Sequence, residues 1–303
     1  MTAFQGVDPA EAFEAYLKLH HRLPATTGNG RATKADFLDI VAPFDLILFD
    51  AYGVLNVGET AIPGAAQTIA ALRSLGKSVA VVSNSAGYPK DRMMARYATL
   101  GFDFAPNEVV TSREALLHRL EGEPPRLWGV MLNPASDPGE IAALDCVILT
   151  DDPADYDRVE GFLLIGSDGW TATRQTLLEA ALRRQPRPVF VGNPDLVAPR
   201  ETGLSMEPGW FAHQLADAAG VVPVFLGKPF PDIFELALAR LASPPAAERV
   251  LMVGDTLHTD ILGGNHAGFA TALVTAHGAL AGLDIAAAIR RSAIMPDFIV
   301  DRI

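Results

Sequence analysis

The feature of this sequence that most constrains its fold is the alternation of short apolar runs with segments of helical periodicity. Apolar runs with the length of a buried strand lie at 46–49, 79–82, 146–149, 162–165, 188–191, 222–226 and 250–253. Segments with helical periodicity lie between them at 65–75, 171–184, 210–219 and 232–241. Strands that alternate with helices form parallel sheets covered by helices on both faces. The pattern therefore predicts an α/β protein.

Loop signals in the middle of the chain predict that one compact unit is inserted into another. The stretches EGEPPRLWG and LNPASDPGE are rich in proline and glycine, and a longer stretch of this kind spans 192–209. We expect residues 112–205 to form the inserted domain and residues 41–111 and 206–303 to form the core domain. Residues 1–40 are expected to form a helical extension, to which the sequence assigns no function.

Composition and charge limit the partners of the chain. Its 303 residues carry a net charge of −12, which repels nucleic acid and anionic membranes, so neither is an expected partner. No apolar run approaches the length of a membrane-spanning helix, and the first residues do not resemble a signal peptide. Cys146 is the single cysteine, which excludes an internal disulfide and fits a cytoplasmic location.

Polar side chains come at or shortly after the ends of several predicted strands. They are Asp50 after 46–49, Ser83 and Asn84 after 79–82, Lys228 after 222–226, and Asp255 and Asp260 after 250–253. In open parallel sheets, ligands bind outside the carboxyl ends of the strands. If these strands are neighbours, one crevice holds three carboxylates, a hydroxyl, an amide and an ammonium group.

Such a set of groups suits a metal ion and a phosphoryl group. Oxygen ligands are those that Mg²⁺ prefers, and crowded carboxylates repel one another without a cation. A serine hydroxyl, a lysine and the N–H groups of a tight turn stabilise a transferring phosphoryl group, and Asp50 is placed to attack phosphorus. Each residue alone is better explained by a turn, a loop or a helix cap. Their joint occurrence in this order favours one site for Mg²⁺ and a small phosphorylated molecule.

The joint pattern resembles the haloacid dehalogenase superfamily, and its flanks resemble the class IIA, NagD-like branch. The first motif is DAYGVL at 50–55, followed by the Ser-Asn pair, the Lys-Pro turn and GDTLHTD at 254–260. The stretches GNPDL, FLGKPFPDIFELAL and VGDTLHTDILGGNHAGF are similar to the branch as well. The resemblance covers about 44–278. It implies a Rossmann-like core with an inserted α/β cap over the site, and most members are Mg²⁺-dependent phosphatases acting on small metabolites.

The resemblance implies how a metal ion would be held. Asp50 would be both the nucleophile and a metal ligand. The backbone carbonyl of Tyr52 and the carboxylate of Asp255 would be further ligands. Asp260 would hold metal-bound water or the lysine.

The resemblance also implies how the substrate would be held. Ser83 and Lys228 would grip the transferring phosphoryl group, supported by Asn84 and the N–H groups around Gly53. The turn after 188–191 would contact the substrate or assist cap closure through its polar residues, and a structural turn is the alternative explanation. These residues are Asn193 and Asp195. Caps of this branch often pair, so a homodimer through the cap is expected by analogy.

Tyr52 departs from the pattern of the phosphatases. The phosphatases of the family carry an aspartate there, which protonates the leaving group and then activates water. An unperturbed tyrosine has a pKa of about 10, so it holds a proton at neutral pH but is a poor base. Because positioned acid–base catalysis is worth about 10²–10⁴ in rate, we expect weak hydrolysis of ordinary phosphate esters, or a substrate whose leaving group needs no proton.

Two alternatives to a phosphatase remain open at the level of sequence. The dehalogenases of the superfamily carry tyrosine at this position, because a halide leaves without a proton. They need no metal and typically lack the paired carboxylates that this chain retains as Asp255 and Asp260. A third possibility is a protein that binds a phosphorylated ligand through an intact metal site without turning it over.

Overall fold

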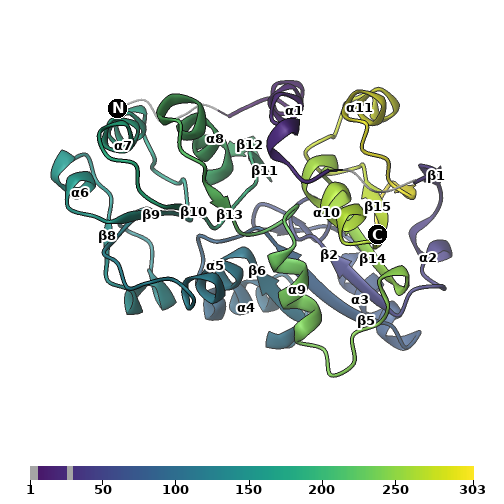
Figure 1. Ribbon diagram of the computed structural model, residues 1–303. Helices are drawn as coiled ribbons and strands as arrows, with labels where there is room; N and C mark the ends of the chain where they lie inside the picture. The colour runs from purple at the N-terminus through teal and green to yellow at the C-terminus, as the bar shows by residue number, and fades with distance from the viewer. Residues whose placement is uncertain (1–5, 26–29) are drawn as a thin grey trace.

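The computed structural model describes residues 6–25 and 30–303 and contains two parallel sheets (Figure 1). The larger sheet has the strand order β1-β16-β15-β14-β2-β5-β6, and every neighbouring pair is parallel. Its strands are β1 (Thr33–Lys34), β2 (Leu46–Phe49), β5 (Ser78–Ser83), β6 (Val109–Thr111), β14 (Val250–Gly254), β15 (Ala270–Val274) and β16 (Phe298–Val300).

The smaller sheet has the order β13-β10-β9-β7-β8 and is also entirely parallel. Its strands are β7 (Trp128–Met131), β8 (Cys146–Ile148), β9 (Gly161–Leu164), β10 (Val189–Val191) and β13 (Val224–Phe225). Two antiparallel hairpins lie outside the sheets, formed by β3 (Asn56–Val57) with β4 (Thr60–Ala61) and by β11 (Val197–Arg200) with β12 (Gly203–Met206).

Helices cover the faces of both sheets. They are α1 (Pro9–Lys18), α2 (Phe37–Ile40), α3 (Ala65–Ser74), α4 (Lys90–Thr99), α5 (Ser112–Leu120), α6 (Pro153–Asp157), α7 (Ala172–Arg184), α8 (Pro208–Ala219), α9 (Asp232–Ala239), α10 (Leu262–His266) and α11 (Ile285–Ser292). Within the described part of the chain, no helix combines the length and the apolar character needed to cross a bilayer. The predicted α/β class is confirmed, and each predicted strand and helix lies within a residue or two of its expected ends.

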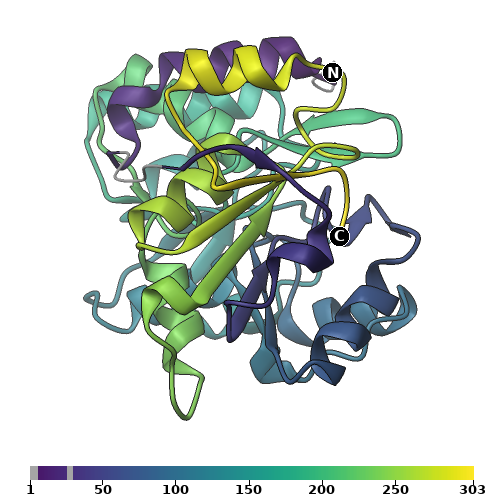
Figure 2. The same cartoon turned by 90° about the vertical axis from the view of Figure 1, so that its right-hand side faces the viewer.

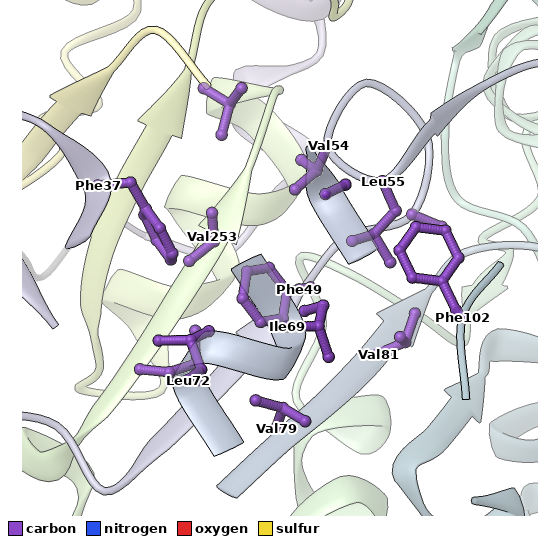
Figure 3. Close-up of a cluster of buried hydrophobic side chains, with 14 of the residues drawn as sticks. Phe37, Phe49, Val54, Leu55, Ile69, Leu72, Val79, Val81, Phe102 and Val253 are labelled. Carbon is purple, nitrogen blue, oxygen red and sulfur yellow. The ribbon is translucent and has the colours of Figure 1, made fainter. Parts of the chain in front are cut away.

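The central strands are apolar on both faces because each face packs against helices. Ile47 and Phe49 of β2 lie in one cluster with α3 and α4, whereas Leu46 and Leu48 lie in a second cluster with α5 and α9. Figure 3 shows the first cluster, with Leu72 of α3 close to Phe49 and its neighbours. Burial on both faces explains why the run 46–49 shows no alternation of polar and apolar residues.

The packing of α3 on the sheet predicts a large stability difference between two leucines of the same segment. Leu72 is fully buried, whereas Leu75, three residues later, is 60% exposed. Leu72→Ala is expected to lower the free energy of unfolding by about 2–5 kcal/mol, because it leaves a cavity in the core. Leu75→Ala is the matched control and should change it by less than about 0.5 kcal/mol. Urea unfolding measures both, and equal effects would contradict this account of the core.

The structure corrects two predicted boundaries. The smaller sheet extends past position 205, because α8 packs on α7 and β13 pairs with β10. The N-terminal segment 1–40 is also more than a helical extension. Residues 33–34 form β1, which pairs with β16 at the edge of the larger sheet, while 1–5 and 26–29 lie outside the described residues. Both pairings join segments distant in sequence, so neither has a local signal.

The strand order places the site. From β2 the chain continues to β5 and β6 on one side, and it returns through the smaller sheet to β14 on the other side. The switch of direction therefore falls at β2, where open parallel sheets bind ligands at the carboxyl ends of the strands.

Candidate active site

A cavity of about 810 Å³ lies at the carboxyl ends of the central strands, between the two sheets. Its floor includes Asp50 and Asp255 from the larger sheet. Its opposite wall includes Asn133 and Trp170, which follow β7 and β9 of the smaller sheet, and Arg200 of the β11–β12 hairpin. The smaller sheet and the hairpin thus enclose a space above the polar strand ends.

Asp50 continues β2, since its N–H donates to the carbonyl of Val253 on β14 over 2.8 Å. A tight turn follows, in which Gly53 has a φ of +81° and donates its N–H to the carbonyl of Asn56 over 2.8 Å. A Cβ on Gly53 would lie 2.5 Å from a carboxylate oxygen of Asp255. Glycine is therefore required here by the backbone conformation, and also because the Asp255 carboxylate after β14 lies so close.

Lys228 lies where the chain passes from β13 of the smaller sheet to α9. Its Nζ is 2.6 Å from Oδ1 of Asp50 and 2.8 Å from Oδ1 of Asp260, and its side chain is almost completely buried. Burial alone would lower the pKa of Lys228, but the carboxylates of Asp260 and Asp50 raise it above its usual value. Burial raises the pKa of Asp50 to about 6, with the charge of Lys228 opposing this shift. Lys228 is therefore a buried cation in direct contact with Asp50, which lines the cavity.

The loop after β14 holds two buried carboxylates. Asp255 accepts hydrogen bonds from the N–H of Ala279 over 2.7 Å and from the hydroxyl of Thr256 over 3.0 Å. Asp260 lies in a π-helical turn, Leu257–Ile261, and accepts from the N–H of Thr256 over 3.0 Å. Burial raises the pKa of Asp255 well above its usual value, and the charges of Asp50 and Asp260 add to this effect.

The three carboxylates fit a metal ion. One oxygen each from Asp50, Asp255 and Asp260 lie within 4.8 Å of one another, and all three residues are buried. Lys228 is the cation in direct contact with this cluster, so the carboxylates outnumber it. Like charges at such distances are costly without a further cation. Oxygen donors of this kind suit hard divalent ions such as Mg²⁺.

Asn84 connects the neighbouring strand end to both sides of the site. Its side chain accepts from the N–H of Lys228 over 2.8 Å and donates to the carbonyl of Lys228 over 2.9 Å. It also donates to Asp195 over 2.7 Å. Ser83 lies beside it at the end of β5, is buried, and lines the cavity. The side-chain amide of Asn193 donates to Glu207 over 3.1 Å, and its side-chain carbonyl oxygen accepts from the N–H of Asp195 over 3.0 Å. Asn193 and Asp195 also line the cavity.

Tyr52 is held between two arginines. The guanidinium carbon of Arg96, on α4, lies 5.0 Å from the ring centroid, and that of Arg200, on the β11–β12 hairpin, lies 4.9 Å from it. Burial raises the pKa of Tyr52, and the two arginines only partly oppose this. Tyr52 is therefore protonated at neutral pH, as the sequence predicts for a residue that is a poor base.

Sequence reasoning missed the residues that arrange these groups. Arg200 contacts the ring of Tyr52 and pairs with Glu207, just after β12, over 2.9 Å, yet nothing local in the sequence marks it. Gly278 is a second case, since a Cβ there would lie 2.2 Å from that of Asp255. Its presence in the Ala-His-Gly-Ala stretch is a glycine signal that sequence reasoning did not use.

Comparison with known proteins gives the class to which this fold and site belong. The model for haloacid dehalogenase-like hydrolases matches residues 47–135, and a HAD-hydrolase-like model matches residues 225–303. Rat chronophin is 31% identical over 251 residues, which cover 80% of each chain. The chain therefore belongs to the haloacid dehalogenase-like hydrolases.

Solved structures agree with this assignment. A possible sugar phosphatase from Cytophaga hutchinsonii is 25% identical, with a TM-score of 0.78 over 90% of this chain and 98% of that one. A glycerol phosphate phosphatase from Mycobacterium tuberculosis, solved with calcium, is 28% identical, with a TM-score of 0.62 over 77% of this chain and 66% of that one. The predicted resemblance, the Rossmann-like fold and the prediction of a hydrolase are confirmed.

Proposed function

We propose that this chain is a Mg²⁺-dependent phosphatase of small phosphorylated metabolites that works through an aspartyl-phosphate on Asp50. The observation that carries the proposal is the position of the Asp50 carboxylate. It lies at the floor of the cavity, 2.6 Å from the ammonium of Lys228, within a cluster of three buried carboxylates. The relatives named as phosphatases support the same chemistry.

In this proposal, Asp50 attacks phosphorus in line with the leaving oxygen, and the Asp50–phosphorus bond forms as the ester bond breaks. Lys228 carries a charge that stabilises the phosphoryl oxygens, and Ser83 donates its hydroxyl to one of them. Asn84 holds Lys228 in place through its backbone. Water then cleaves the aspartyl-phosphate and releases phosphate.

Asp50, Asp255 and the backbone carbonyl of Tyr52 would hold Mg²⁺, with Asp260 behind them. When bound, the ion neutralises the carboxylate cluster and draws charge from the phosphoryl group. Tyr52 is a poor proton donor and a still poorer proton acceptor. Esters whose leaving groups have a low pKa are therefore the better substrates, because these groups depart without a proton. Acid–base catalysis of the second step is weakened for the same reason.

The proposed substrate is small because the cavity is bounded by the smaller sheet and the hairpin. Its polar wall, which includes Asn133 and Ser167, offers hydrogen bonds to a hydroxylated or acidic organic group. We propose that the smaller sheet acts as a cap in this sense. A homodimer through this cap stays a prediction, for which size-exclusion chromatography with light scattering is the test.

Metal removal gives the direct test of the proposal. Phosphate release from a panel of alkyl, aryl and acyl phosphates is expected to need Mg²⁺ and to fall by at least about 10²-fold after chelation, because the ion stabilises transition-state charge. Aryl and acyl phosphates should be hydrolysed faster than alkyl phosphates. Readdition of Mg²⁺ is the control and should restore the rate.

Three other outcomes of these measurements would contradict the proposed function. Binding of Mg²⁺ and of a phosphorylated ligand without release of phosphate would indicate a binding protein. Metal-independent halide release from haloacids, with no phosphate release, would indicate a dehalogenase. Phosphate release that persists unchanged in chelator would contradict the proposed role of the carboxylate cluster.

A further inference from the structure

We propose that Tyr16, on the N-terminal helix α1, is a positioning residue that fixes two active-site loops at once. The inference rests on the proposed function, because those loops carry the residues assigned to substrate and metal. No function of the N-terminal segment is evident from sequence, and Tyr16 is about 180 residues from one loop and 240 from the other. The structure brings all three segments together.

The hydroxyl end of Tyr16 meets the loop after β10. The phenolic oxygen accepts a hydrogen bond from the backbone N–H of Leu196 over 3.0 Å, and both residues are buried. Leu196 directly follows Asp195, which holds Asn84, and Asn84 in turn holds the backbone of Lys228. The phenol is therefore linked to the backbone of Lys228 through the Asp195–Leu196 peptide and the hydrogen bonds of Asp195 and Asn84.

The face of the Tyr16 ring meets the loop of the carboxylates. It stacks on His258 with ring centroids 4.8 Å apart and an angle of 7° between the planes, while Phe13 packs on the same imidazole edge-on at 5.7 Å. His258 lies between Asp255 and Asp260 in the sequence. Neither of its ring nitrogens has a hydrogen-bond partner among the described residues, although the side chain is 1% exposed. The side chain is therefore held by packing rather than by hydrogen bonds of its ring, and two rings of α1 contribute to that packing.

The segment around Tyr16 contacts both the part of the molecule that contains the smaller sheet and hairpin and the part that contains the larger sheet. These contacts keep Tyr16 in place. On one side, Val7 donates its N–H to the carbonyl of Leu204 on β12, and Arg22 pairs with Asp217 on α8. On the other side, α1 runs alongside α11, as Figure 2 shows, and Glu14 pairs with Arg291. Figure 1 shows α1 above the junction of the two halves. Tyr16 is thus buried where the hairpin, the smaller sheet and the carboxylate loop converge.

Two variants of Tyr16 separate its two contacts. Tyr16→Phe keeps the stacked ring and removes the hydroxyl, so kcat is expected to fall about 5- to 10-fold through displacement of the Asp195–Asn84–Lys228 chain. Its Mg²⁺ affinity should stay within about twofold of the wild type, since the ring still packs on His258. Tyr16→Ala loses both contacts, so its Mg²⁺ affinity should fall about 10-fold in addition, as for other groups that orient metal ligands.

The matched control is Tyr156→Phe. Tyr156 is equally buried but lies on α6, and its hydroxyl donates to the carbonyl of Thr150 over 2.8 Å. This variant also loses a hydrogen bond between a phenolic hydroxyl and the backbone, here donated by the hydroxyl, on a helix that packs against the smaller sheet. It should change kcat and Mg²⁺ affinity by less than twofold. A similar loss of kcat in Tyr156→Phe and Tyr16→Phe would show a general effect of stability and overturn the proposal.

Calorimetric titration of the full chain with Mg²⁺ alone keeps this test distinct from that of the proposed function. If the wild type binds Mg²⁺ but releases no phosphate, the proposed function fails, and the Tyr16→Ala affinity still decides whether α1 positions the carboxylate loop. If a folded Tyr16→Ala variant binds Mg²⁺ as tightly as the wild type, α1 does not position the carboxylate loop. If Tyr16→Ala does not fold, the decision falls to Tyr16→Phe, whose unchanged kcat would overturn the proposal. A wild type that neither binds Mg²⁺ nor releases phosphate overturns both.

Discussion

Asp50→Asn is expected to lower phosphate release by about 10³-fold or more, because an amide cannot attack phosphorus as a carboxylate does. Asparagine has the same shape, and Lys228 keeps its second partner, Asp260, at 2.8 Å. Burial raises the pKa of Asp50 from 3.8 to about 6, so without metal its ionisation lowers the stability as pH rises between these values, and the full penalty is present above them. The variant should therefore unfold at the same temperature as the wild type or a higher one.

The matched control is Asp45→Asn, which makes the same chemical change just before the other end of β2. Asp45 is half exposed and pairs with Arg249 at the surface. Its loss should leave the rate within about twofold, because exposed ion pairs contribute little. Initial rates of phosphate release at saturating Mg²⁺ measure both variants. If Asp50→Asn kept more than a tenth of the wild-type rate, Asp50 would not be the nucleophile.

Tyr52→Asp is expected to raise the hydrolysis of alkyl phosphates by about 10- to 100-fold, because it supplies the acid–base group that this chain lacks. Aryl phosphates should gain less, since their leaving groups depart without a proton. The structure indicates that the site tolerates the change. The guanidinium carbons of Arg96 and Arg200 lie 5.0 and 4.9 Å from the ring centroid of Tyr52. These two positive charges would offset the new negative charge.

Tyr52→Asn is the control for this gain. It removes the same ring and leaves nearly the same space, but it can neither donate nor accept a proton in the required way. The ratio of alkyl to aryl phosphate hydrolysis should rise in the aspartate variant and not in the asparagine variant. Equal rates in the two variants, with Mg²⁺ binding intact, would show that Tyr52 does not limit the reaction.

The floor of the candidate site could be predicted from sequence because its signals are local. A run such as 46–49 that is apolar at every position must be covered on both faces, which makes it a central strand. The polar residue that ends such a strand then lies at the carboxyl edge of the sheet. The sequence left open whether the strands that end at Asp50 and Asp255 are neighbours, and the pairing of β2 with β14 makes them so. Asn84 at the end of β5 follows from the same reasoning.

Other elements had no such signal. β15 reads ATALV, and its alanines and threonine make a weakly apolar run that becomes a strand because β14 and β16 pair with it on both sides. β1 is two exposed polar residues, which are a strand only through pairing with β16. Any segment whose backbone lies next to a strand edge finds hydrogen-bond partners there, whatever its side chains are.

The sequence by itself determined the α/β class and the family, and it indicated that carboxylates lie at the ends of central strands, because apolar runs and the polar residues that follow them are close in the chain. Only the tertiary structure decided what surrounds these carboxylates. The placement of Arg200 on Tyr52, and of Tyr16 between Leu196 and His258, joins residues separated by more than a hundred positions. Such contacts depend on how the two sheets, the hairpin and α1 pack together, and packing between distant segments leaves no periodicity or spacing in the sequence.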